Sequence, residues 1–376
     1  MKIWMRSLVP KDWIIKDRHN NCIEVNYTIK GSHRFEPKPV QFPKIIEVDA
    51  QFVEGLALYL GDGSFQKKRQ HASFVSKDKD IMLHEWLFFK NKFGIGPKEV
   101  SCYISFRANN PNIKKDWASF LGLPENKFSI RHSTRHKHEA MQLQINRSAF
   151  IRIFELVRNK ILESNFLESK ELRLAFLRGL FAAEGSIGIA TTDSPKPYIN
   201  FISYHISFYE DKLASLIKKA LELENIKFSV TRREKDHSIV IRMTGWDNYW
   251  KLWRAKIFDL CERKKTKFLK VAKDLEINCT FPEKFREKLF AKTRFSQKEL
   301  AKYLTSWQSN VSKMLKGELS ISVDRLLILS KLNGINLEHI KENIQQTTVG
   351  SLTRINDKGF IELVFDLKTN PTNLYS

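Results

Sequence analysis

An apolar segment that ends in one acid and a glycine occurs twice in this chain, and no other feature constrains the fold as strongly. The copies occupy residues 53–64 and 175–186. Each copy predicts a helix whose last turn carries the acid, Asp62 in the first and Glu184 in the second. A glycine then leads into a strand in both copies.

Small residues four positions apart lie on one face of each predicted helix. These residues are Ala57 and Gly61 in the first copy, and Gly179 and Ala183 in the second. Small faces allow two helices to approach backbone to backbone. If the helices pair in parallel, the two acids are expected side by side at one end.

Two carboxylates a few ångströms apart repel, and one of them must then take a proton. A bound divalent cation removes this repulsion, and oxygen ligands suit Mg²⁺, with Mn²⁺ as the alternative. The predicted metal ligands are Asp62 and Glu184, together with the backbone carbonyls of Gly61 and Ala183. Two buried helices whose acids only cap a turn are the structural alternative, which the repeated acid–Gly–Ser ending disfavours.

The composition favours a polyanionic partner. Among 376 residues, 64 Lys and Arg face 42 Asp and Glu, a net charge of +22. Such a charge suits nucleic acid or an anionic membrane surface. No apolar run approaches the roughly 18 residues that cross a bilayer, and the first residues lack a signal-peptide core. We therefore expect a cytoplasmic, nucleoid-associated protein without a targeting signal.

The order of predicted elements repeats as helix-strand-strand-helix-strand-strand-helix. This α+β pattern predicts two units, at 49–162 and 163–275, whose pseudo-twofold pairing forms a saddle. Asp78 is the predicted N-cap of a helix through residue 93, and one helix is expected over 247–262. In the arm at 1–48, short strands are predicted at 13–15 and 23–27, and an extended, proline-containing linker at 37–43.

Residues 177–185, Leu-Arg-Gly-Leu-Phe-Ala-Ala-Glu-Gly, are similar to the signature of LAGLIDADG homing endonucleases, and residues 55–63 resemble a diverged copy. In double-motif members of that family, the acid of each motif binds divalent metal between the two scissile phosphates. The resemblance therefore implies a monomeric, site-specific double-strand DNA endonuclease. Asp62 and Glu184 would be its catalytic acids, and duplex DNA with a long asymmetric target site its partner.

Phosphodiester hydrolysis also needs basic side chains near the metal. The resemblance places one at the end of the second strand of each half, where the first half offers Lys77. The second half has no cation there, so Lys265 is predicted, with Lys264 and Lys160 as alternatives. A basic cluster at 131–138 is predicted to be a solvated loop that contacts phosphate.

Side chains that read base edges are expected on the strands and on one C-terminal helix. The predicted DNA-binding residues are Gln66, Lys67, Lys68, Arg69, His71, Arg107, Gln142, Gln144, Arg232, Arg233, Arg242, Gln308, Ser309, Asn310 and Lys313. Most residues of such a set contact phosphate, which fixes register and not sequence.

Residues 280–340 resemble the helix-turn-helix of Cro- and repressor-like domains, and this resemblance implies an all-α domain. Ser296 and Glu299 predict a capping box at the first helix, and residues 309–313 open the predicted recognition helix. An all-helical structural appendage is the alternative. The tail, 341–376, is predicted to be a β hairpin, and residues 364–367 resemble a late block of intein splicing domains, which implies an intein-derived ancestry.

Two other functions stay open at this point. The same combination of a LAGLIDADG-like domain and a helix-turn-helix resembles some non-enzymatic bacterial regulators, although such a binder has no use for two abutting carboxylates. An RNA maturase that assists intron splicing is the third hypothesis.

Overall fold

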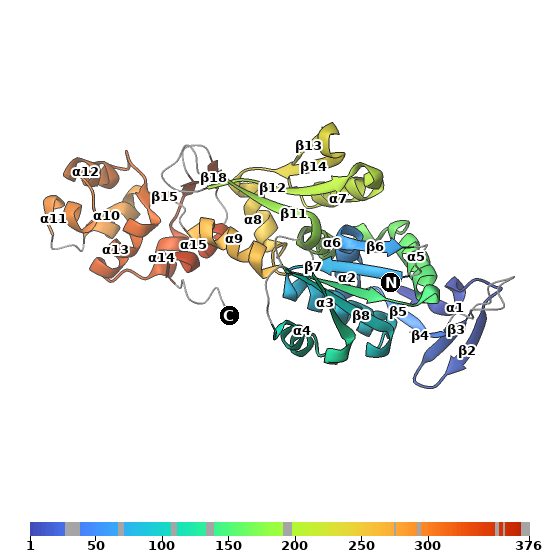
Figure 1. The fold of residues 1–376 in the computed structure, drawn as a ribbon. Coiled ribbons are helices and arrows are strands. Elements are labelled where there is room, and N and C mark those ends of the chain that lie inside the picture. The colour runs from blue at the N-terminus through green and yellow to red at the C-terminus, as the bar shows by residue number, and fades with distance from the viewer. Residues whose placement is uncertain are drawn as a thin grey trace. The chain divides into compact units, whose positions relative to one another are not determined.

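The computed structural model of the chain is mixed α/β (Figure 1). It describes residues 1–26, 38–66, 71–106, 111–132, 139–190, 198–273, 276–291, 295–349, 353–355 and 358–369. The chain divides into two compact units, one of 1–186, 203–242 and 252–265, the other of 187–202, 243–251 and 266–376. No helix in the described ranges is long and apolar enough to cross a membrane.

The N-terminal arm is more structured than predicted. Its elements are β1 (Lys2–Trp4), α1 (Met5–Leu8), β2 (Ile14–Arg18), β3 (Cys22–Asn26), β4 (Val40–Pro43) and β5 (Ile45–Glu47). Strands β2, β3 and β4 form one sheet, and β1 pairs with β5. The predicted extended linker is therefore wrong at residues 40–43, where Val40 and Phe42 are buried and pair with β3.

The first half contains the predicted elements and two that were not foreseen. They are α2 (Ala50–Asp62), β6 (Gly63–Gln66), β7 (His71–Ser76), α3 (Lys79–Phe93), β8 (Val100–Phe106), α4 (Ile113–Leu121), β9 (Phe128–His132), β10 (Ala140–Ile145) and α5 (Ser148–Leu162). The strands form one sheet in the order β6-β7-β10-β8-β9. Helix α4 and strand β9 are the additions, and β9 runs parallel to β8.

Helix α2 buries one face against aromatic rings of the first half. Tyr59 lies with its ring centroid 5.0 Å from that of Phe154 and 5.7 Å from that of Phe89. Phe88 and Phe93 join the same cluster. Burial of such rings is a large apolar contribution to stability, and it leaves the small-residue face of α2 directed elsewhere.

The second half repeats the helix-strand-strand order. Its elements are α6 (Lys170–Glu184), β11 (Gly185–Ala190), β12 (Tyr198–Ser207), α7 (Asp211–Leu223), β13 (Ser229–Arg233), β14 (Ser238–Met243), α8 (Trp246–Arg254) and α9 (Glu262–Lys273). The strands have the order β11-β12-β14-β13. The single helix predicted over 247–262 is wrong, because α8 ends at Arg254 and the next helix, α9, begins only at Glu262.

A helix-ending turn separates α8 from α9. Lys256 takes the left-handed conformation, with φ of 56°. Its N–H donates to the Trp253 carbonyl at 2.8 Å, and the Ile257 N–H donates to the Leu252 carbonyl at 3.1 Å. These two bonds make a Schellman motif, which ends a helix without requiring glycine.

The C-terminal part is not all-helical, and that prediction is wrong. Its elements are β15 (Ile277–Thr280), α10 (Glu283–Ala291), α11 (Gln297–Tyr303), α12 (Gln308–Lys316), β16 (Ile321–Ser322), α13 (Val323–Asn333), α14 (Leu337–Glu342), β17 (Gln346–Val349), β18 (Thr353–Ile355) and α15 (Lys358–Thr369). The strands form a sheet in the order β16-β15-β17-β18. The capping box of Ser296 and Glu299 is confirmed at the start of α11.

The predicted β tail is only partly correct. Strands β17 and β18 pair antiparallel, but residues 358–369 form helix α15 where a strand was expected. Phe360, Ile361, Val364 and Phe365 are all buried. Their spacing fits one face of a helix, whereas alternate residues share a face in a strand.

Candidate active site

Helices α2 and α6 form an extensive contact through their small residues (Figure 1). A Cβ placed on Gly61 would lie 2.4 Å from the Ala183 Cβ. One placed on Gly179 would lie 2.3 Å from the Glu54 carbonyl oxygen and 2.8 Å from the Ala57 Cβ. No larger side chain fits at either glycine, so the predicted close approach of the two helices is confirmed.

Gly55, the first residue of the diverged copy of the motif, is required by packing. A Cβ on Gly55 would lie 2.3 Å from Cγ of Phe88 on α3, so the glycine makes room for that ring. On the other side of the helix pair, Arg178 and Glu54 form an ion pair at 2.6 Å between the helices. Arg178 also donates to the Ala255 carbonyl at 3.1 Å, which ties α6 to the end of α8.

The two motif acids are the last residues of their helices. Asp62 ends α2 and Glu184 ends α6, and both side chains are half-buried. A Cβ on Gly61 would lie 3.0 Å from Cγ of Glu184, which places the second acid against the end of the first helix. The tertiary structure therefore brings the two predicted acids together; we call them the acid pair.

Burial makes both members of the acid pair hard to ionise, and the charge of Asp62 adds to this effect at Glu184. Burial raises the pKa of Asp62 to about 6. Burial and then the charge of Asp62 raise the pKa of Glu184 to about 7, and Glu210 adds to the rise. In both cases the positive charge of Lys264 acts in the opposite direction.

A third acid, Glu85 on α3, is completely buried, and neither of its carboxyl oxygens has a hydrogen-bond partner among the described residues. Burial raises its pKa well above the ordinary value, and the charge of Asp62 raises it further. An unpartnered carboxyl in an apolar interior is stable in its neutral form. Burial and the charge of Asp62 thus both favour the neutral form of Glu85.

The donor set of the acid pair fits a divalent cation only in part. Within the described ranges no group of three or more His, Cys, Asp or Glu side chains is placed to hold a metal ion. Two carboxylates suffice for Mg²⁺ when phosphate oxygens and water complete its shell. The predicted carbonyl ligand on Ala183, however, accepts a hydrogen bond from Lys264 at 3.2 Å.

Lys264 is a buried cation that the structure places at this helix end. Its side chain is 6% exposed, and its ammonium donates to the carbonyls of Phe181 and Ala182 at 2.7 Å each. Burial lowers its pKa to about 8, so it remains protonated at pH 7. A cation at the C-terminus of a helix compensates the negative end of the helix dipole and satisfies its open carbonyls.

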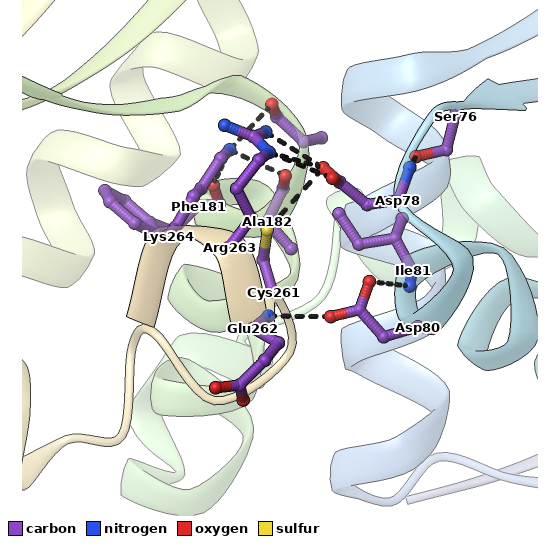
Figure 2. A network of polar contacts seen from close by, with 11 residues as sticks. Ser76, Asp78, Asp80, Ile81, Phe181, Ala182, Cys261, Glu262, Arg263 and Lys264 are labelled. Carbon is purple, nitrogen blue, oxygen red and sulfur yellow. Dashed lines mark hydrogen bonds and ion pairs between the residues drawn. The ribbon is translucent and has the colours of Figure 1, made fainter. Parts of the chain in front are cut away.

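Residues 261–264, at the start of α9, join the second half to the first (Figure 2). Arg263 donates to both carboxylate oxygens of Asp78, each at 2.9 Å. The Cys261 thiol also donates to Asp78, at 3.7 Å, and the Glu262 N–H donates to Asp80 at 2.6 Å. This polar network fixes the start of α9, and with it Lys264, against the first half.

Arg263 also explains why Asp78 does not act as predicted. Asp78 is the N-cap residue of α3, but its side chain makes no capping hydrogen bond. Burial raises the pKa of Asp78, and the hydrogen bonds and charge of Arg263 lower it by more, so the net pKa is lowered. The carboxylate is thus held ionised by a residue 185 positions away along the chain.

The lysines predicted to be catalytic, Lys77 and Lys265, have different surroundings. Lys265 forms an ion pair with Asp259 at 3.4 Å. Lys77 is exposed between β7 and α3, next to Asp78, and the alternative Lys160 is exposed near the end of α5. Among the four lysines considered, Lys264 is the one whose charge acts on both acids.

The predicted DNA-binding residues fall into three groups. Lys67, Lys68, Arg69 and Arg107 lie outside the described residues, and for Gln66 only the backbone is described, opposite His71 in the sheet. His71 is 6% exposed, which does not fit a residue that reads base edges. The others are exposed or half-buried, on β10 (Gln142, Gln144), β13 (Arg232, Arg233), β14 (Arg242) and α12 (Gln308, Ser309, Asn310, Lys313).

Two of the exposed arginines are engaged in ion pairs. Arg232 pairs with Asp211 at 3.3 Å, and Arg233 pairs with Asp236 at 3.9 Å. The basic cluster at 131–138 is not a loop at its start, because Arg131 and His132 end strand β9. Residues 133–138 lie outside the described part of the chain.

Sequence reasoning missed Arg263 and Glu85, and it named Lys264 only as an alternative to Lys265. Neighbouring lysines on a helix differ only in the direction they face, and that direction depends on where the helix docks. The burial of Glu85 could have been suspected from the sequence, because four apolar residues follow it in the run Glu85-Trp86-Leu87-Phe88-Phe89.

The acid pair is expected to make the free chain less stable as the pH rises. Unfolded carboxyls ionise near pH 4, whereas the folded pKa values are about 6 and about 7. The folded chain therefore binds more protons over this range, and its free energy of unfolding falls with increasing pH. The Asp62→Asn/Glu184→Gln double variant, called the acid-pair variant below, should lose this slope and exceed the wild type by about 1–2 kcal/mol at pH 8, after allowance for solvent screening.

Urea unfolding of both proteins between pH 4 and pH 8 measures this difference. A divalent cation that binds only the folded acids should raise the stability of the wild type at pH 8 and leave the acid-pair variant unchanged. An identical pH slope in the two proteins would show that the pKa values of the two acids are not raised in the folded chain.

No family model matches the chain, and a comparison with curated proteins finds no match. Among solved structures, the chain is similar to the N-terminal LAGLIDADG domain of DUF199/WhiA (12% identity, TM-score 0.33, covering 56% of this chain and 82% of that one). It is also similar to full-length DUF199/WhiA from Thermatoga maritima (12% identity, TM-score 0.33, covering 76% of this chain and 94% of that one). A third similar structure is that of I-DmoI in complex with DNA and Ca (13% identity, TM-score 0.27, covering 54% of this chain and 86% of that one). With TM-scores below 0.5, these likenesses assign no activity to this chain.

Proposed function

We propose that this chain is a site-specific double-strand DNA endonuclease of the double-motif LAGLIDADG type. The observation that carries the proposal is the acid pair, two carboxylates at the ends of helices whose glycines leave no room for larger side chains. A fold that needs only packing has no reason to bury Asp62 and Glu184 together, since burial raises both pKa values, the charge of Asp62 raises that of Glu184 further, and both effects cost stability. Such a cost is expected where the site has a function.

Asp62 and Glu184 would hold the metal, with the carbonyl of Gly61 as a further oxygen donor. A divalent cation bound there would neutralise the scissile phosphate and make a water molecule more acidic. The chain's own contribution is to keep both carboxylates in place before DNA arrives. The Arg178–Glu54 pair and the glycine contacts hold the two helices in register.

Lys264 would position Glu184 and adjust its charge. Its ammonium holds the last carbonyls of α6, the helix that Glu184 ends. Its positive charge lowers the pKa of both acids, which favours the ionised forms that a metal requires. Arg263, through Asp78, keeps this end of α9 against the first half.

Duplex DNA is the proposed substrate, and a net charge of +22 suits it. The repeated order of elements supports the proposal that the two halves form a pseudo-twofold saddle over the duplex. The exposed residues Gln308 and Lys313 on α12 support a second contact, made by a helix-turn-helix of α11 and α12. Such a contact would lengthen the recognised site.

Incubation of the chain with Mg²⁺ and a plasmid library of candidate sites tests this function. The acid-pair variant is the matched control, because it keeps the shape of both side chains and cannot ionise them. Sequence-specific linearisation by the wild type alone supports the endonuclease. Binding without cleavage in every divalent metal tried would exclude it, and binding should weaken steeply with added salt.

A non-catalytic DNA-binding regulator is the second candidate, and one observation favours it. Lys264 already supplies a positive charge at the acid pair and uses the Ala183 carbonyl, so the site is compensated in the absence of a metal. A regulator would show identical DNA binding by the wild type and the acid-pair variant, with no cleavage by either. The plasmid experiment separates the two candidates directly.

A further inference from the structure

The added strand β9 extends the first sheet beyond the strands that the sequence predicted. Four residues of this sheet are register partners on the adjacent strands β7, β10, β8 and β9. They form a row of Val75, Gln142, Tyr103 and Ser129. Their neighbours along the strands, such as Phe74, Met141 and Cys102, are buried. The row therefore lies on the sheet face that points away from the core.

This face has the chemistry of a surface that contacts base edges. Val75 is 43% exposed, although it is apolar, and Gln142 and Tyr103 are half-buried. An exposed apolar side chain suits the methyl group of thymine, and an amide suits adenine. No acidic side chain occupies the row.

Arg131, two residues beyond Ser129 on β9, lies over this row. Its guanidinium carbon is 3.6 Å from the centre of the Tyr103 ring, a distance at which the planar group stacks on the ring. Its Nη1 also donates to the Gln142 side-chain oxygen at 3.5 Å. An exposed arginine is thus held by two neighbours in a fixed orientation.

A fixed orientation distinguishes base reading from phosphate binding. Phosphate accepts a mobile point charge from almost any direction, so a contact to it gains little from preorganisation. Guanine presents O6 and N7 in one plane at the major-groove edge, and a guanidinium matches both atoms with two parallel donors. Stacking on Tyr103 reduces the side-chain entropy that such a bidentate contact would lose on binding.

We propose that Arg131, stacked on Tyr103 and steadied by Gln142, reads a guanine in the major groove of the bound duplex. This inference rests on the proposed DNA-binding function and adds a sequence requirement to it, a G·C pair at one position of the half-site under the first sheet. The two neighbouring row residues, Gln142 and Val75, would contact the adjacent pairs.

Selection of bound duplexes from a randomised library tests the proposal, with the full-length acid-pair variant as the parent so that the bound DNA stays intact. Arg131→Lys keeps the charge and loses the two-donor fork. We expect the guanine preference at one position to fall from at least about fivefold to less than about twofold. Preferences at the other positions and non-specific affinity should stay unchanged.

Substitutions of Tyr103 test whether its ring positions Arg131. Tyr103→Leu removes the stacking surface and should weaken the same guanine preference, whereas Tyr103→Phe keeps the ring and should retain it. If Arg131→Lys lowers affinity uniformly without changing any base preference, Arg131 contacts phosphate only and the proposal is wrong.

The outcomes also separate this inference from the proposed nuclease. If the acid-pair variant selects guanine through Arg131 and the wild type never cleaves DNA, the nuclease is excluded and the inference is supported. A parent that binds no duplex would exclude both. A nuclease whose specificity is indifferent to Arg131→Lys would exclude the inference alone.

Discussion

Replacing Lys264 by methionine is expected to lower the rate of DNA cleavage at pH 7 by about 10²–10³-fold, the effect of removing one preorganised charged donor. Methionine keeps the length of the side chain and removes its charge. Without that charge the pKa values of Asp62 and Glu184 rise further, because Lys264 lowers both in the wild type. Single-turnover cleavage across pH measures the change, and its acidic limb should move to higher pH.

Lys265→Met is the matched control, since Lys265 is the next residue and pairs with Asp259 instead. Its cleavage rate and pH profile should match those of the wild type. A merely structural role for Lys264 would lower the stability and leave the pH profile in place. If Lys265→Met abolished cleavage and Lys264→Met did not, the original sequence-based choice would be correct and the role given to Lys264 wrong.

Gly179→Ala is expected to destabilise the chain by about 3 kcal/mol, at the upper end of the usual cost of overpacking. The added methyl group would lie 2.3 Å from a backbone oxygen of Glu54, so α2 and α6 must separate. Helix propensity alone predicts the opposite sign, since alanine in a helix interior is better than glycine by about 1 kcal/mol. The sign of the change in urea unfolding therefore reports whether the helices are paired.

Gly96→Ala carries the same chemical change at an open position, where a Cβ would meet nothing closer than 3.6 Å, and it should be nearly neutral. A reciprocal exchange gives a second check at the acid end of the helices. Gly61→Ala alone would place a methyl group 2.4 Å from the Ala183 Cβ and should be destabilising. Gly61→Ala with Ala183→Gly restores one small partner and should recover most of that loss.

Much of the local structure could be predicted because its causes are local. The capping box of Ser296 and Glu299 lies within four residues of chain, and the structure confirms it. The helices that end at Asp62 and Glu184 follow from apolar runs closed by glycine, and both end at the predicted acid. Even the pairing of these helices could be expected, since their small residues recur at helical spacing.

The errors arise where two local patterns fit the same residues. The apolar residues between Phe360 and Phe365 fit either period, and packing in the second unit favoured the helical one. The break between α8 and α9 depends on Lys256 in a left-handed conformation, which its residue type does not predict. Strand β9 gains its role only through pairing with β8.

The sequence by itself determined the acid pair: two helices of helical periodicity, small faces that let them meet, and one acid at the end of each. The tertiary structure alone decided which side chains bind the helix end and the polar network beside that pair. Lys264 and not Lys265 reaches the carbonyls of α6, more than 80 positions away, and Arg263 holds Asp78 across 185 positions. Periodicity and capping act within a few residues and can be recognised from the chain. The partner of a buried charge depends on how distant segments dock, and no local pattern encodes that direction.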